Sequence, residues 1–159
     1  MTSRPPPITL RHGVTHRCLD GHPWVYATEL REPLDVPPGT IVDVRDKGGR
    51  FVGRGIANPK SQIIVRLLTR DEGEPIDAAL IRRRVREAAA YRARVLDDPR
   101  HGRVIYSESD GLSGLVCDRF GDVLVVQILS VAMESMREAV IAAKAVQRHE
   151  YPPLRHKSP

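Results

Sequence analysis

Residues 39–69 read GTIVDVRDKGGRFVGRGIANPKSQIIVRLLT, and this stretch determines the fold of the first half of the chain. A Pro-Gly turn precedes the apolar run that begins at Ile41, and Gly48-Gly49 is typical of a hairpin bend between two strands. The final run, QIIVRLLT, is β-branched and apolar, which favours a central strand. These signals predict a small β-rich module over residues 1–72, preceded by an extended, poorly ordered arm of seven residues that contains three prolines.

A helical period replaces this pattern beyond residue 73. Asp77 can cap a helix, and Ile76 and Ile81 are placed to form a hydrophobic staple around the cap. The helix is expected to end near Leu96, because Asp97-Asp98-Pro99 follows. Its apolar face is Ile81, Val85, Ala88 and Val95, and its opposite face is Arg83, Arg86, Ala90 and Arg94. That arginine-rich face is either simply solvated or a surface that binds phosphates.

Three further strands and a helix are expected after this. The strands are RVIYSES, GLVCDRF and DVLVVQIL, with a hairpin through Gly121. Ser130 can cap one final helix, on which Met136, Val140 and Ala143 share a face. The fold class is therefore α+β, with a strand-helix-strand-strand-helix module over residues 73–150 if part of the first sheet is shared. Residues 151–159 are predicted to be an irregular tail.

Composition points to a globular protein. Hydrophobic residues make up 41% and charged residues 28% of the 159 residues. No apolar run approaches the ~18 residues that span a bilayer, and the N-terminus lacks a signal peptide, so we expect a cytoplasmic protein without membrane contact. The net charge is +5, and the excess lies in residues 1–72, which carry 11 Lys and Arg against 8 Asp and Glu. This excess weakly favours an anionic partner.

Several short motifs resemble catalytic or ligand-binding motifs but do not have the residue spacing that those motifs require. Gly53-Arg54-Gly55 lacks the third glycine of a dinucleotide loop and leads into a strand, and Ser113 in GLSGL lacks the spacing of a hydrolase elbow. Cys18 and Cys117 belong to no CxxC pair, which predicts two buried thiols. His12, His16 and His22 do not form the HExxH pattern, so no metal site is expected.

The single tryptophan, Trp24 in DGHPWVYATEL (residues 20–30), permits two interpretations. A lone tryptophan in a small β module usually packs with its indole N–H satisfied. The alternative is a ring that stacks on an unpaired RNA base.

Three strings taken together resemble a known family: GHPWVYATEL, the stretch at residues 39–69, and ESDGLSGLVCDRFGDVLVVQILS. They are similar to the N-terminal part of the bacterial class I SAM-dependent 23S ribosomal RNA methyltransferases that modify cytosine at carbon 5. The resemblance covers about residues 9–149 in the same order. Ser113 departs from it, since the family has proline in that loop.

This resemblance implies that residues 1–72 are a PUA domain, a small β-barrel associated with RNA binding, and that residues 73–150 are a central α+β domain. In the family, methyl transfer takes place on a further Rossmann-like domain, which needs about 150 residues. Only nine residues follow Glu150, so we expect a truncated form without that domain. By itself it should hold neither catalytic residues nor the family's cofactor, S-adenosyl-L-methionine (SAM).

The predicted function is therefore to recognise or position large-subunit rRNA for such a methyltransferase. The candidate RNA contacts are Arg11, Arg17, His22, Trp24, Arg54, Asn58, Lys60 and Arg66. An alternative is a protein-interaction module that docks on a separate catalytic partner or self-associates as a homodimer, because loss of a covering domain exposes apolar surface.

Overall fold

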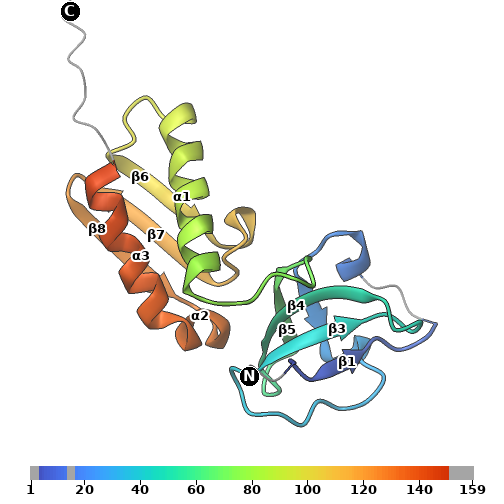
Figure 1. Ribbon diagram of the computed structural model, residues 1–159. Coiled ribbons are helices and arrows are strands. Elements are labelled where there is room, and N and C mark those ends of the chain that lie inside the picture. The colour runs from blue at the N-terminus through green and yellow to red at the C-terminus, as the bar shows by residue number, and fades with distance from the viewer. Residues whose placement is uncertain (1–3, 14–16, 151–159) are drawn as a thin grey trace, which may run out of the picture.

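A five-stranded curled sheet forms the first module of the computed structural model, which describes residues 4–13 and 17–150 (Figure 1). The strand order is β1-β3-β4-β5-β2, and every pair is antiparallel except β1 with β3. The strands are β1 (Pro7–Thr9), β2 (Trp24–Tyr26), β3 (Ile41–Arg45), β4 (Phe51–Ala57) and β5 (Ile63–Thr69), and the short helical turns are η1 (Arg17–Asp20) and η2 (Ala27–Glu29).

The hairpin and the central strand predicted within residues 39–69 are confirmed. The hairpin between β3 and β4 bends at Gly48-Gly49, where Gly49 has a φ of +83° that a residue with a side chain rarely adopts. β5 lies between β4 and β2, and is therefore central as predicted. The expectation of a loose arm fails at its end, because the Pro6 carbonyl accepts a hydrogen bond from the Asp43 N–H and Pro7 begins β1. Residues 1–3 lie outside the described residues.

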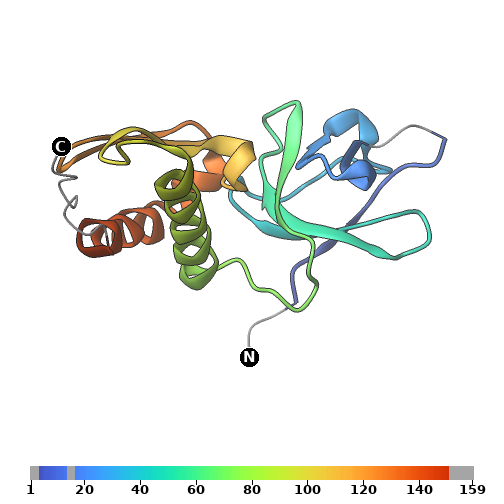
Figure 2. The same ribbon diagram turned by 90° about the horizontal axis from the view of Figure 1, so that it is seen from above.

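The second module has its own antiparallel sheet, β6-β7-β8, covered on one face by helices (Figure 2). The strand-helix-strand-strand-helix order, which required part of the first sheet to be shared, is not observed, since no strand of one sheet pairs with the other within the described residues. The elements are α1 (Ala78–Val95), β6 (His101–Tyr106), η3 (Ser107–Asp110), β7 (Leu115–Phe120), β8 (Val123–Ile128), α2 (Val131–Ser135) and α3 (Arg137–Glu150).

Helix α1 begins as the sequence predicts. The Asp77 carboxylate accepts hydrogen bonds from the N–H groups of Ala79 and Leu80, at 2.8 and 3.0 Å. Ile81, Val85 and Ala88 are buried, whereas Val95, on the same face in the last turn of the helix, is 54% exposed. On the opposite face, Arg83 forms ion pairs with Glu74 and Glu87.

The predicted final helix is two helices. Ser130 caps only the five-residue α2, with its hydroxyl accepting from Met133 N–H, and Met136 leaves the helical conformation at φ −106° and ψ 14°. The chain has no glycine or proline at this break, so no local signal predicted it. The apolar spacing still holds in α3, where Val140 and Ala143 are buried.

The two modules share a hydrophobic core. Ile56 of β4 and Leu68 of β5 belong to the same buried cluster as Ile81, Leu115 and Met133 of the second module. Both cysteines are buried, as expected, and neither forms a disulfide; burial raises the pKa of the Cys18 thiol to about 11. Within the described residues, no helix is both long and apolar enough to cross a membrane.

Candidate nucleic-acid interface

Trp24 and Arg66 are cross-strand neighbours on β2 and β5, the two strands nearest one end of the first sheet. Residues that face each other in an antiparallel pair point to the same side of the sheet. The Arg66 guanidinium accordingly lies 5.3 Å from the centre of the Trp24 ring, within the range of a cation–π interaction. The two side chains form one amphipathic surface.

The second module completes this surface through η3 and the loop after it. The Trp24 indole N–H donates to Glu108 Oε1 at 2.9 Å, and Arg66 Nη1 donates to Glu108 Oε1 at 3.1 Å and to Ser113 Oγ at 2.9 Å. The Ser113 hydroxyl donates to the same carboxylate oxygen at 2.6 Å. We call these four residues the junction cluster. It joins positions up to 89 residues apart in the sequence.

Glu108 is the centre of the cluster's electrostatics. Partial burial by itself would raise the pKa of its carboxyl group, but hydrogen bonds donated by Ser107, Ser113 and Trp24 outweigh that effect and hold the pKa at about 2. Glu108 is therefore ionised at neutral pH and neutralises Arg66. The carboxylate fixes the arginine and the indole between the modules.

Replacing Glu108 with Gln is expected to lower the free energy of unfolding at pH 7 by about 1–2 kcal/mol, since charge-assisted hydrogen bonds are lost from a side chain that water still partly screens. The folded-state pKa lies below the ordinary value of 4.5, so the stabilisation is complete above that value and disappears as the pH falls towards about 2. Urea denaturation of both proteins at neutral and acid pH measures this. The exposed Glu87→Gln variant serves as the control; a stability gap for Glu108→Gln that stays constant with pH would contradict the assignment.

A crevice of about 180 Å³ opens beside the cluster, between the β4–β5 loop and the start of α2. Its polar lining comes from both modules and comprises Asn58, Ser61, Arg66 and Ser130. Ile56, Ile63 and Leu129 are among its apolar walls. Apolar walls with a few polar groups are the usual lining of a small-ligand site.

Asn58 and Lys60 occupy the loop at this crevice. The Asn58 side-chain oxygen accepts from the Lys60 N–H at 3.2 Å, and the Asn58 N–H donates to the Ile64 carbonyl at 2.8 Å, so the loop is tied to β5. Lys60 is exposed. His22 lies on the other side of Trp24, edge to face at 5.0 Å, and its Nδ1 accepts from the Trp24 N–H. Of the predicted residues, Asn58 and Arg66 line the crevice, Lys60 lies in the same loop as Asn58, and Trp24 and His22 follow Arg66 through ring contacts.

The other three predicted residues lie apart from the cluster. Arg54 is only 9% exposed, and its guanidinium donates to Asp43 at 2.6 and 3.2 Å and to the Glu74 carbonyl at 2.8 Å. Strand alternation places it directly opposite Asp43 of β3, which explains the pairing, so we leave Arg54 out of the interface. Arg11 is exposed and donates to the Thr28 carbonyl, and Arg17 is exposed at the start of η1.

Sequence reasoning missed Glu108 as a partner and treated Ser113 only as a turn residue. It also missed Arg84 of α1, whose guanidinium donates to the carbonyls of Leu68 and Gly111 and so links both modules. A cue for Ser113 was present, because serine replaces the proline expected in that loop. Nothing in the sequence pattern pointed to Glu108 or Arg84.

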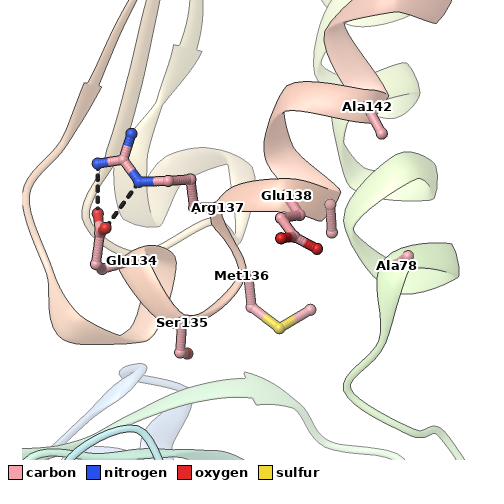
Figure 3. A pocket seen from close by; sticks show the side chains of 8 residues that line it. Ala78, Glu134, Ser135, Met136, Arg137, Glu138 and Ala142 are labelled. Carbon is pink, nitrogen blue, oxygen red and sulfur yellow. Dashed lines mark hydrogen bonds and ion pairs between the residues drawn. The ribbon is translucent and has the colours of Figure 1, made fainter.

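A larger cavity of about 620 Å³ lies between the start of α1 and the α2–α3 break (Figure 3). The Met136 thioether and the methyl groups of Ala78 and Ala142 line it, and Arg137 is paired with Glu134 at its rim. None of the predicted RNA contacts reaches it. Among the described residues, no group of three or more His, Cys, Asp or Glu side chains is arranged to hold a metal ion.

The curled five-stranded sheet is similar to a known type of domain. Residues 8–70 match the family model of the PUA-like domain. The matched residues contain β2 to β5 and all of β1 except Pro7, and they include His22, Trp24, Asn58, Lys60 and Arg66. The junction cluster forms where this PUA-like domain meets the second module.

Relatives extend the similarity into the second module. The ribosomal RNA large subunit methyltransferases I of Salmonella arizonae and Shewanella denitrificans are each 39% identical, over 87% and 88% of this chain. The chain spans only 35% and 36% of their lengths. In structure, it resembles a protein from Streptococcus mutans assigned as a SAM-dependent methyltransferase, with a TM-score of 0.72 and 12% identity over 89% of this chain and 37% of that one. The chain is thus homologous to part of these rRNA methyltransferases.

Proposed function

We propose that this chain binds large-subunit rRNA through the PUA-like domain and the crevice beside the junction cluster. The observation that carries the proposal is that Arg66 and Asn58 line one crevice whose far wall belongs to the second module, with the Trp24 ring packed against Arg66 beside it. Apolar walls suit the face of an unpaired base, and the polar groups suit its edge or the adjacent phosphate.

Homology to part of the rRNA methyltransferases supports a role for this RNA binding. We propose that the chain presents rRNA to a class I, SAM-dependent enzyme that methylates cytosine at carbon 5, and that residues 73–150 act as the central domain between recognition and catalysis. Methyl transfer and SAM binding would belong to the part of the relatives that this chain does not cover, which is about two thirds of their length.

In this arrangement the side chains of Trp24 and Arg66 are held in one conformation at the surface. Glu108 holds both side chains, so their edges are presented in one orientation and little side-chain entropy is lost on binding. Lys60 is exposed at the same loop and supplies an additional positive charge for a phosphate.

Lys60→Ala is expected to weaken binding to a large-subunit rRNA segment and to reduce the slope of log affinity against log salt by about one, because one phosphate contact is lost. Fluorescence anisotropy over a salt series measures both quantities. The matched control is Arg94→Ala, which removes an exposed positive charge near the end of α1 and should leave affinity and slope unchanged.

Two results would contradict the proposal. One is binding of rRNA no tighter than that of heparin, a polyanion without bases. The other is a salt slope near zero for the unmodified chain, since phosphate contacts release counterions.

A further inference from the structure

The outer edge of β8 has none of the usual protection against pairing with another strand. An edge strand presents unpaired N–H and C=O groups, and proteins normally guard it with charges, proline, a bulge or very short length. Residues Val123 to Leu129 read VLVVQIL, without a charge or a proline. The pairing of β8 with β7 is regular over six residues, so no bulge twists this edge away.

The other three sheet edges in the described part of the chain are guarded. β6 carries His101 and Arg103 and has an irregular register between Arg103 and Ile105. β1 and β2 are three residues long, and β1 starts with a proline. The contrast singles out β8, which Figure 1 shows at the outside of its sheet.

The same strand also exposes an apolar stripe on the open face of the sheet. Leu124, Val126 and Ile128 pack against the core beneath the helices, so the alternate residues point to the face that Figure 2 shows uncovered. On this face Val123 is 58% and Val125 is 44% exposed, and the neighbouring Phe120 is 58% exposed. These side chains lie directly beside the unprotected edge.

We propose that β8 is a self-association surface, which pairs antiparallel with β8 of a second copy of this chain to form a continuous six-stranded sheet. An antiparallel pair about a two-fold axis joins the same strand to itself, so each outward N–H finds the partner's C=O. With Val125 opposite Val125 of the second copy, Val123 lies opposite Gln127, and all of these residues are on the open face of both copies. Because residues 123–129 carry no charge, no like charges would lie opposite each other in this pairing.

A second copy fits this edge better than an RNA strand does. VLVVQIL carries no positive charge for phosphates, and its unused groups are main-chain donors and acceptors in strand spacing. The proposal does not depend on RNA binding, because the pairing is centred on Val125, which neither belongs to the junction cluster nor lines the crevice.

The test is the molar mass of the full chain in solution, measured by size-exclusion chromatography with light scattering over a concentration series. We expect twice the 17.8 kDa of one chain at high concentration. Val125→Lys should raise the dimer dissociation constant by about tenfold or more, because two like charges would then lie opposite each other at the axis. Val125→Thr, which keeps the β-branched shape without a charge, should still dimerise.

Leu19→Lys provides a control at an equally exposed apolar residue of the other module, and should leave the mass unchanged. Hydrogen exchange gives an independent readout, since β8 amides should lose protection on dilution while those of β5 do not. A chain that stays monomeric over the whole series overturns the proposal and leaves the edge to a different protein. A dimer that Val125→Lys does not weaken also overturns it, because the contact would then lie elsewhere.

Discussion

Replacing Arg54 with Met is expected to lower the free energy of unfolding by about 3–5 kcal/mol, because it leaves the buried Asp43 carboxylate without its hydrogen-bonded partner and with only the Arg45 guanidinium at 3.9 Å. Asp43 is 1% exposed, and Arg54 donates two hydrogen bonds to it. Methionine fills much of the same volume but cannot neutralise the charge. Urea denaturation followed by tryptophan fluorescence measures the loss, with Trp24 as the single reporter.

A companion variant separates charge from packing. The double variant Asp43→Asn with Arg54→Met should recover much of the stability, because no unpaired charge remains. Affinity for rRNA, corrected for the folded fraction, should not change in Arg54→Met. A stable variant with weakened rRNA binding would instead restore Arg54 to the phosphate contacts that its sequence context suggested.

Gly55→Ala is expected to cost about 3 kcal/mol, because its Cβ would overpack the first sheet. That atom would lie 2.4 Å from the Arg66 carbonyl oxygen and 2.7 Å from a methyl carbon of Val65, both on the adjacent strand. Backbone cannot move aside as a flexible side chain does, so β4 and β5 would have to separate. The midpoint of urea denaturation reports the change.

Gly73→Ala is the matched control. The nearest atom to a Cβ there is a side-chain oxygen of Asp71 at 3.3 Å, and the site is exposed, so we expect a change within about 0.5 kcal/mol. Equal stabilities for the two alanine variants would show that the close strand approach at Gly55 does not limit the fold.

The glycines of GGRFVGRGIAN show how far the sequence could be interpreted. Their spacing correctly excluded a dinucleotide loop, since β4 is a strand between two strands. It could not show why Gly55 is needed, because the obstructing atoms belong to β5, which is about ten residues further along the chain. Local signals such as turns, caps and period were sufficient for most element types, although the strand predicted over residues 103–109 ends at Tyr106 and Ser107–Asp110 form η3. These signals were not sufficient for the break at Met136 or the separation into two sheets.

The candidate site was predictable only in part for the same reason. Trp24 and Arg66 were recognised individually, but their contacts with Glu108 and Ser113 join residues 42 to 89 positions apart, a pairing that no local pattern encodes. The packing interpretation of Trp24 agrees with its satisfied indole N–H, and its position beside a crevice leaves the base-stacking interpretation a proposal. Arg54 shows the converse case. Its sequence context suggested a phosphate contact, but its guanidinium is hydrogen-bonded to the buried Asp43 carboxylate.

The core that Ile56 and Leu68 share with the second module has a mechanical consequence for the crevice. The two walls of the crevice belong to different modules that pack around one core, so the distance between the walls is set before a ligand binds. A ligand must therefore fit this width, and the crevice selects ligands by shape before hydrogen bonds select among them.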